Sequence, residues 1–137
     1  MDLEAQERNK SILPKAFISL PLRNRSEQQV VEAWNTAIKQ ASEAYYYKCV
    51  SEDENIKSVD LNIISSLISS IPEDDDEIGN VSVWCLGRSI QKLAQADFVY
   101  FAEGWKEARG CLIEYDVATA YDIPIITFEE YKEKQND

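Results

Sequence analysis

The sequence predicts an α/β protein: a single-domain, Rossmann-like or flavodoxin-like three-layer sandwich with a parallel sheet of about four to five strands. Short, nearly all-apolar segments alternate with segments of helical periodicity, which is typical of a parallel sheet covered by helices on both faces. The chain has 137 residues, 45% of them hydrophobic, and suits one domain with a substantial core. Residues 1–14 are expected to form a flexible N-terminal arm, and the domain covers 15–137 with an acidic insert at 49–80.

The first expected strand is the apolar run "KAFISL" (15–20), which ends in the loop "PLRNR". A helix should begin after this loop, because Ser26 and Gln29 have the spacing of a capping box. The helix is expected to reach about residue 47. Its apolar stripe comprises Val30, Trp34, Ala37, Ile38, Ala41, Ala44 and Tyr45.

The insert at 49–80 holds nine acidic residues and one lysine, so it carries most of the net charge of −11. A short strand is expected near 56–60, followed by a short helix that stops at Pro72. The loop "EDDDE" (73–77) offers clustered oxygens that hard cations prefer, but it lacks the ligand spacing of a calcium loop. A solvated loop is therefore the favoured interpretation, and no metal site is predicted. The apolar side of the short helix comprises Leu61, Ile64, Ile68 and Ile71.

The C-terminal half alternates helix and strand. "DFVYFA" (97–102) and "IPIITF" (123–128) are expected as strands, with a helix at 108–121 between them. Asp97 precedes its strand, so it is interpreted as a turn or cap residue at the edge opposite to the ligand edge. A further amphipathic helix precedes Asp97, with an apolar side formed by Val83, Leu86, Gly87, Ile90, Leu93 and Ala94.

The helix at 108–121 has a carboxylate in its apolar stripe. Glu114 shares helical spacing with five small, apolar or aromatic residues, and an ionised carboxylate on a buried face is costly unless it is paired or used. One interpretation is a functional carboxylate. The other, given equal weight, is an N-terminal-turn carboxylate favoured by the helix dipole or paired with Arg109. The remaining members of the stripe are Gly110, Ile113, Val117, Ala118 and Tyr121.

Composition excludes several classes of function. A net charge of −11 argues against a nucleic-acid-binding protein, and the sequence shows neither a membrane span nor a signal peptide. The chain contains no histidine, which excludes Ser-His-Asp and Cys-His catalysis and the usual zinc sites. Three separated cysteines without a CxxC motif indicate reduced thiols and a cytoplasmic protein.

Ligands of open parallel sheets bind beyond the carboxyl ends of the strands, here in the loops "PLRNR" and "EGWKEARG". Arg23 and Arg25 suit a phosphate or a carboxylate, although each alone could simply be solvated. Trp105 could stack on a ligand or pack within its loop. The helix beginning near Ala108 lacks a capping side chain, and Gly110 would let a ligand approach its open N-terminus. Neither loop has a dinucleotide or P-loop motif.

Three segments resemble the nucleoside 2-deoxyribosyltransferase-like superfamily, nearest to its small bacterial and phage members: "FISLP", "LGRSIQKLAQADFVYFAEGW" and "ARGCLIEYDVATAYDIPII". The resemblance covers 15–47 and 81–127. It implies that Glu114 is the nucleophile that attacks the anomeric carbon of a (deoxy)ribosyl group and expels the base. The implied activity is an N-glycosidic bond hydrolase or transferase acting on a (deoxy)nucleoside, nucleotide or ADP-ribose-like compound.

The resemblance also implies the other members of the site. Ser89 stands where many relatives carry an Asp that contacts the sugar or assists proton transfer, so it is a candidate catalytic residue beside Glu114. Relatives commonly assemble as dimers or larger homo-oligomers. No cofactor is expected, and the partner is a small nucleoside or nucleotide ligand. The candidate substrate-binding residues are Ser19, Pro21, Arg23, Arg25, Glu103, Trp105, Ala108, Arg109 and Gly110.

This sequence also departs from the family pattern. Ser89 replaces the Asp of many relatives, and Ala108 replaces the Ser of the close ones. Phe17 stands where relatives that act on nucleoside monophosphates have Tyr, and Leu20-Pro21 where they have Gly-Ser. These losses support an alternative function as a non-catalytic protein that senses or sequesters a nucleotide. A partner-binding domain with a vestigial site is a third hypothesis.

The electrostatic expectation concerns Glu114. If it accepts N–H hydrogen bonds at an open helix N-terminus with Arg109 nearby, its charged form is favoured and its pKa should lie below about 4.3. If it is instead buried without such partners, desolvation should raise its pKa. We expect the first case.

Overall fold

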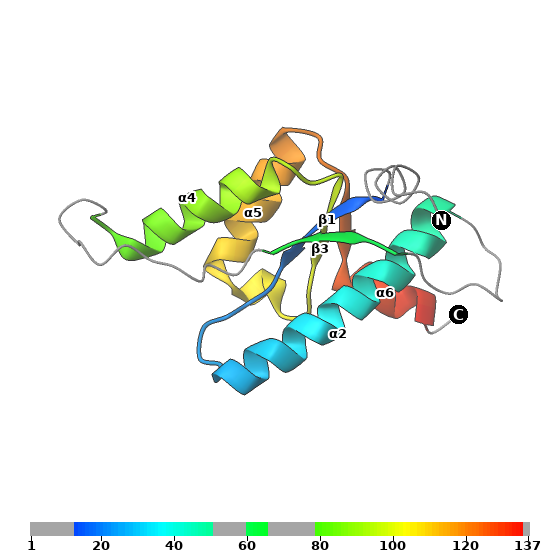
Figure 1. The fold of residues 1–137 in the computed structure, drawn as a ribbon, viewed down its shortest axis with the longest axis horizontal. Coiled ribbons are helices and arrows are strands. Elements are labelled where there is room, and N and C mark those ends of the chain that lie inside the picture. Colours follow the sequence, from blue (N-terminus) through cyan, green and yellow to red (C-terminus); the bar gives the residue numbers. More distant parts are fainter. Residues whose placement is uncertain (1–12, 51–59, 66–78, 136–137) are drawn as a thin grey trace, which may run out of the picture.

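The computed structural model describes residues 13–50, 60–65 and 79–135, without the side chains of residues 49 and 50. The described chain forms a four-stranded parallel sheet in the order β2-β1-β3-β4 (Figure 1). This confirms the predicted α/β class. The strands are β1 (Lys15–Ser19), β2 (Asn62–Ile64), β3 (Phe98–Phe101) and β4 (Ile125–Thr127). The longer helices are α2 (Glu27–Tyr45), α4 (Val81–Leu93), α5 (Arg109–Ala120) and α6 (Phe128–Gln135).

Two short helical segments complete the fold. The π-helical turn η1 (Tyr46–Val50) continues α2, and the 3₁₀ turn η2 (Trp105–Glu107) precedes α5. The short, mostly charged helix α6 was not predicted from the sequence. Within the described residues, no helix has both the length and the apolar composition that crossing a membrane requires.

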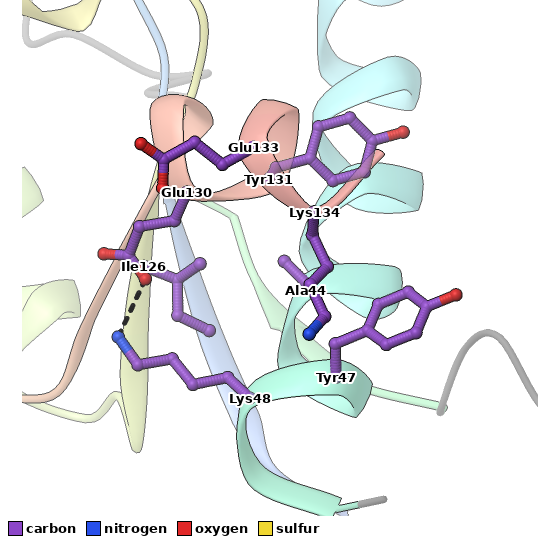
Figure 2. Close-up of a pocket in the computed structure, with 8 residues that line it drawn as sticks. All are labelled: Ala44, Tyr47, Lys48, Ile126, Glu130, Tyr131, Glu133 and Lys134. Atoms are coloured by element: carbon purple, nitrogen blue, oxygen red, sulfur yellow. Dashed lines mark hydrogen bonds and ion pairs between the residues drawn. The ribbon is translucent and has the colours of Figure 1, made fainter. Parts of the chain in front are cut away.

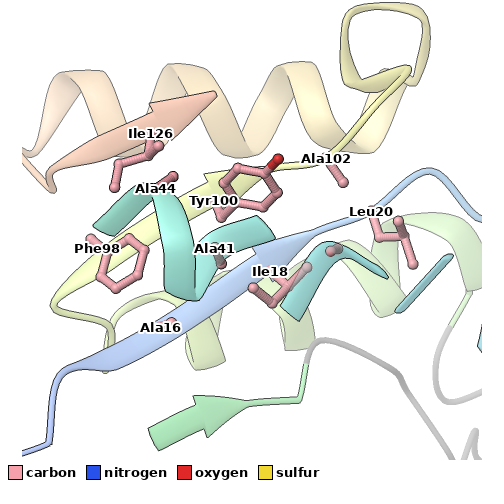
Figure 3. Packing of buried hydrophobic residues seen from close by; sticks show 10 residues of the cluster. Ala16, Ile18, Leu20, Ala41, Ala44, Phe98, Tyr100, Ala102 and Ile126 are labelled. Atoms are coloured by element: carbon pink, nitrogen blue, oxygen red, sulfur yellow. The ribbon is translucent and has the colours of Figure 1, made fainter. Parts of the chain in front are cut away.

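Helices cover both faces of the sheet (Figure 1). On one face, side chains of β1, β3 and β4 pack against α2 and α6; Figure 3 shows Ile18, Tyr100 and Ile126 in this cluster beside Ala41 and Ala44 of α2. On the other face, alternate side chains of the same strands pack against α4 and α5. The strands are therefore buried on both sides, which explains their nearly continuous apolar sequences. The second cluster is built around Phe17, Leu93, Val99, Phe101, Trp105, Cys111 and Ala118.

Local sequence signals position the helix starts. The Ser26 hydroxyl accepts from the Gln29 backbone N–H at 3.2 Å, and the Gln29 side-chain carbonyl accepts from the Ser26 N–H at 2.8 Å, so the predicted capping box is present. Asn80 caps α4 by accepting from the N–H of Val83 at 3.1 Å. Asp97 accepts a hydrogen bond of 2.8 Å from the N–H of Lys15, at the amino edge of the sheet. This agrees with its structural interpretation.

The expectations for the acidic insert need correction. Leu61 and Ile64 were assigned to a short helix, but Ile64 is the last residue of β2 and Leu61 directly precedes this strand. Pairing with β1 decides this, because Ile64 lies opposite Phe17 in a parallel register. The spacing of so few apolar residues does not distinguish a strand from a helix. The N-terminal arm up to residue 12, residues 51–59 and residues 66–78, including Ile68, Ile71, Pro72 and "EDDDE", lie outside the described residues.

The buried sides of α4 and α5 also differ from the predicted stripes. In α5, Gly110, Ile113 and Tyr121 are exposed, Tyr121 to 77%, and the buried residues are Cys111, Glu114 and Ala118. In α4, Val83, Gly87 and Ala94 are exposed, whereas Leu93 is buried and Leu86 and Ile90 are half-buried. In α5 the buried side chains are small or polar, whereas α4 covers the larger apolar residues of its predicted stripe and leaves the smaller ones exposed.

Candidate functional site

Glu114 lies on the side of α5 that faces the carboxyl end of β1. It is only 6% exposed, and its Oε1 accepts a 2.8 Å hydrogen bond from the hydroxyl of Ser19. Ser19 is the last residue of β1 and is 1% exposed. Because side chains alternate along a strand, Ser19 points to the same face as Phe17, toward α4 and α5. The end of the strand and the second turn of the helix thus hold a buried carboxyl–hydroxyl pair.

Burial sets the proton affinity of this carboxyl group. Desolvation raises the pKa of Glu114 from its ordinary 4.5 to about 7, and the hydrogen bond from Ser19 opposes this only in part. The expectation of a lowered pKa is therefore wrong. Ala108, at the N-cap of α5, provides no side-chain hydrogen bond, as predicted, but the Glu114 side chain faces the sheet rather than the open helix end. Arg109 is exposed, and no ion pair joins it to Glu114 among the described residues.

Cys111 also belongs to this buried group, although it is not among the residues predicted for the site. Burial raises the pKa of its thiol to about 11, a hydrogen bond with Ser19 and the charge of Arg25 lower it, and the charge of Glu114 raises it. Cys111 is therefore a neutral thiol at pH 7, next to both partners of the Ser19–Glu114 pair. The sequence signal for this was its position three residues before Glu114, because residues with this spacing lie on the same side of a helix.

A groove of about 390 Å³ opens at the same edge of the sheet, between α2 and the carboxyl ends of β1 and β3. Its floor is small and apolar, with Leu20, Ala37 and Ala102, and its rim is mostly polar. Such a surface suits a small ligand with several hydrogen-bonding groups. The polar rim consists of Asn24, Arg25, Gln29, Glu32, Thr36, Gln40 and Glu103.

Arg25 lines the groove, and its charge lowers the pKa of the Cys111 thiol, which belongs to the cluster on the other face of the sheet. The guanidinium Nη1 is buried and has no hydrogen-bond partner among the described residues. Of the two arginines of the "PLRNR" loop, Arg25 is half-buried, whereas Arg23 is exposed and does not line the groove. The loop turns at Asn24, whose φ of 64° lies in the left-handed region.

The structure places the remaining predicted site residues as follows. Glu103 lines the groove, and Pro21 contacts the loop at Gly104, since a Cβ on Gly104 would lie 3.6 Å from the Pro21 side chain. Trp105 is buried: its ring stacks on Tyr115 at 4.8 Å, and its Nε1 donates to Glu129 at 3.0 Å. Trp105 therefore packs within its loop and offers no open face to a ligand.

The other predicted residues lie on the helices. Gly110 is exposed at the start of α5, with nothing within 4 Å of a Cβ built on it. Ala108 is half-buried before it. Ser89 is half-buried on α4, and no hydrogen bond joins it to Glu114 among the described residues. Ser19, rather than Ser89, is the serine that contacts Glu114.

A second cavity, of about 300 Å³, lies between the end of α2 and α6 (Figure 2). Two of its charged groups pair with each other, Lys48 with Glu130 at 2.9 Å, and Lys134 lies 5.8 Å from the ring centre of Tyr47. None of its lining residues belongs to the predicted site. The groove beside Arg25 is therefore the better candidate for a ligand.

Among the described residues, no group of three or more acidic, cysteine or histidine side chains could hold a metal ion. Comparison of the chain with protein-family models, with curated proteins and with solved structures finds no match in any of the three.

Proposed function

We propose that the protein cleaves or transfers an N-glycosidic bond of a (deoxy)nucleoside, nucleotide or ADP-ribose-like compound, with Glu114 as the nucleophile. The observation that carries the proposal is the buried Glu114 carboxyl, held by Ser19 at the carboxyl edge of a parallel sheet, the edge at which the polar groove opens. Ligands of open α/β sheets bind at this edge. The family resemblance of the sequence assigns the nucleophile to the same residue.

The proposed reaction follows the two steps of retaining glycosidases. An ionised oxygen of Glu114 bonds to the anomeric carbon as the bond from this carbon to the base nitrogen breaks. The base leaves with the bonding electrons and takes up a proton from water. Water, or a second base, then attacks the anomeric carbon of the glycosyl ester and releases the carboxylate. With a pKa of about 7, about half of the Glu114 carboxyl groups are ionised at neutral pH.

The experiment incubates the protein with deoxynucleosides, deoxynucleotides and ADP-ribose and measures free base by chromatography. We expect turnover of at least one compound, loss of about a thousandfold or more in Glu114→Gln, and unchanged turnover in Asp116→Asn, which removes an exposed carboxylate of the same helix. Intact-protein mass spectrometry after acid quenching should show a glycosyl adduct on the parent protein alone. Equal turnover by parent and Glu114→Gln would refute the proposal.

A second candidate function is nucleotide binding without cleavage. The observation that favours it is that Ser19 is the one side chain that hydrogen-bonds the Glu114 carboxyl among the described residues, and that Glu114 itself does not line the groove. In this case a nucleotide should be recovered intact from the denatured protein. Its affinity should survive Glu114→Gln, and no base should be released.

Two further parts of the proposal are location in the cytoplasm and assembly into a dimer or larger homo-oligomer. Self-association is supported by the family resemblance, because relatives commonly assemble as dimers or larger homo-oligomers. Light scattering of the purified protein at several concentrations tests it; a constant monomer mass would refute it.

A further inference from the structure

Resting on the proposed function, we propose that the groove is an anion subsite in which Arg25 binds the phosphate of the ligand, so that the protein acts on nucleotides rather than on nucleosides. The first observation is the Nη1 atom of Arg25, which is buried without a hydrogen-bond partner in the part of the chain that the structure describes. A buried guanidinium nitrogen without an acceptor is costly, because its hydrogen bonds to water are lost without replacement. Because this nitrogen has almost no accessible surface, an incoming acceptor would remove this cost once the Arg25 side chain turns toward the groove that it lines.

The neighbouring acidic residues do not supply the acceptor. Glu32 and Glu103 line the same groove, yet neither forms an ion pair with Arg25 among the described residues. The carboxylate of Glu32 instead accepts from the side-chain amide of Gln28 at 3.2 Å. The positive charge at this end of the groove is therefore left for a ligand.

The chemistry of the groove selects the class of ligand. Arg25 is the one cationic side chain among its lining residues, and a guanidinium can bind two phosphate oxygens at once. Glu32 and Glu103 would repel a bare anion, but they accept hydrogen bonds from hydroxyl groups. A ligand that combines an anionic phosphate with sugar hydroxyls fits this distribution better than inorganic phosphate or an uncharged nucleoside does.

The subsite and the reacting carboxyl group lie at the same edge of the sheet. Arg25 lies in the loop that directly follows β1, and Ser19 is the last residue of that strand, so both belong to the carboxyl edge of the sheet. A phosphate held at Arg25 would place the attached sugar at the same edge as the Ser19–Glu114 pair. Arg25 would act as a binding and positioning residue, and Glu114 as the reacting group.

The test measures binding in Glu114→Gln protein, where turnover does not interfere, with the four common deoxynucleosides, their 5′-monophosphates and inorganic phosphate, by calorimetry. We expect at least one monophosphate to bind roughly ten- to a hundredfold more tightly than its nucleoside. Arg25→Gln should abolish this preference, and Arg25→Lys, which keeps the charge but not the planar fork, should keep part of it. Lys39→Gln removes an exposed charge from α2 outside the groove and should leave the preference unchanged. Circular dichroism checks that each variant is folded.

Each possible result decides the proposal. Equal affinity for nucleoside and monophosphate, a preference that survives Arg25→Gln, or no binding of any compound at millimolar concentration would overturn it. Inorganic phosphate that binds as tightly as the monophosphates would also overturn it. Glu114-dependent cleavage of nucleosides without a phosphate preference would refute the subsite alone. An Arg25-dependent preference without base release would instead refute the reaction and leave the subsite standing.

Discussion

The hydroxyl of Ser19 donates a 2.8 Å hydrogen bond to Oε1 of Glu114 across 95 positions of sequence. Both side chains are buried, and Ser19 is the one side-chain donor to this carboxyl group among the described residues. Desolvation raises the pKa of Glu114 to about 7, and the hydrogen bond from Ser19 opposes this only in part. The predictions below start from this pair and from the loops around it.

The stability of the protein should fall as pH rises from about 5 to 8. A carboxyl group whose folded pKa is raised, from 4.5 to about 7, holds its proton in the folded state when the unfolded chain has lost it. Its stabilising contribution is present below pH 4.5 and is lost as pH rises through 7, by about 3 kcal/mol in total. Glu114→Gln should remove this dependence, so the variant gains stability relative to the parent at pH 8. Urea unfolding at several pH values measures it, with Asp116→Asn as control. Equal pH slopes for parent and Glu114→Gln would contradict the prediction.

Ser19→Ala should raise the pKa of Glu114 further and destabilise the fold by about 1–2 kcal/mol, because a buried carboxyl oxygen loses its donor. Ser89→Ala should leave the pKa of Glu114 unchanged, since Ser89 does not contact it. Carbon-13 NMR titration of glutamate carboxyl groups resolves the two cases. If the pKa of Glu114 changes in Ser89→Ala and not in Ser19→Ala, then Ser89 of α4, rather than Ser19, hydrogen-bonds the Glu114 carboxyl group, and the prediction is wrong.

If Glu114 is the nucleophile, kcat/KM should rise with pH to a plateau, with a midpoint near 7, because the ionised carboxylate is the reactive form. Ser19→Ala should shift this midpoint upward along with the pKa. The pH profile of base release measures both effects. A profile that falls with pH through this range would mean that Glu114 acts as an acid.

Alanine substitutions at Gly104, before η2, and at Gly110, in α5, should change the stability of the protein in opposite directions. Gly104 has a φ of 87°, in the left-handed region, so Gly104→Ala should cost about 1 kcal/mol even though the added methyl meets only an ordinary contact with Pro21. Gly110 lies in the first turn of α5 with open space around it, so Gly110→Ala should stabilise the protein by up to about 1 kcal/mol. Thermal unfolding of the two variants and the parent measures both changes in stability. Weaker ligand binding in Gly110→Ala would support a close approach of the ligand to this helix start.

Ser26→Ala should destabilise the protein by about 1 kcal/mol, because it removes one of the two hydrogen bonds of the capping box that begins α2. The same box anchors the loop that carries Arg25. Ser82→Ala, an exposed serine near the start of α4, is the control in urea unfolding. A smaller loss of stability in Ser26→Ala than in Ser82→Ala would contradict the role of the cap.

Several features followed from the sequence by itself. Short all-apolar strands predicted the parallel sheet, the Ser26–Gln29 spacing predicted the capping box, and Ala108 predicted a helix without a side-chain cap. The position of Asp97 before its strand predicted a structural role, and the structure shows its bond to Lys15. These features depend on residues that are neighbours in sequence, or on burial shared by a whole segment, so local patterns are sufficient to predict them.

The tertiary structure alone decided which side of α5 is buried and what its carboxyl group contacts. The helical spacing of Glu114 fitted a stripe with Ile113 and Tyr121, but packing against β1 buried Cys111 instead and exposed those two. The pKa of Glu114 then followed from desolvation, which depends on everything packed around the group rather than on its place in a helix. Likewise, the sequence did not distinguish Arg23 from Arg25, and only the turn at Asn24 and the packing of the loop brought Arg25 to the groove.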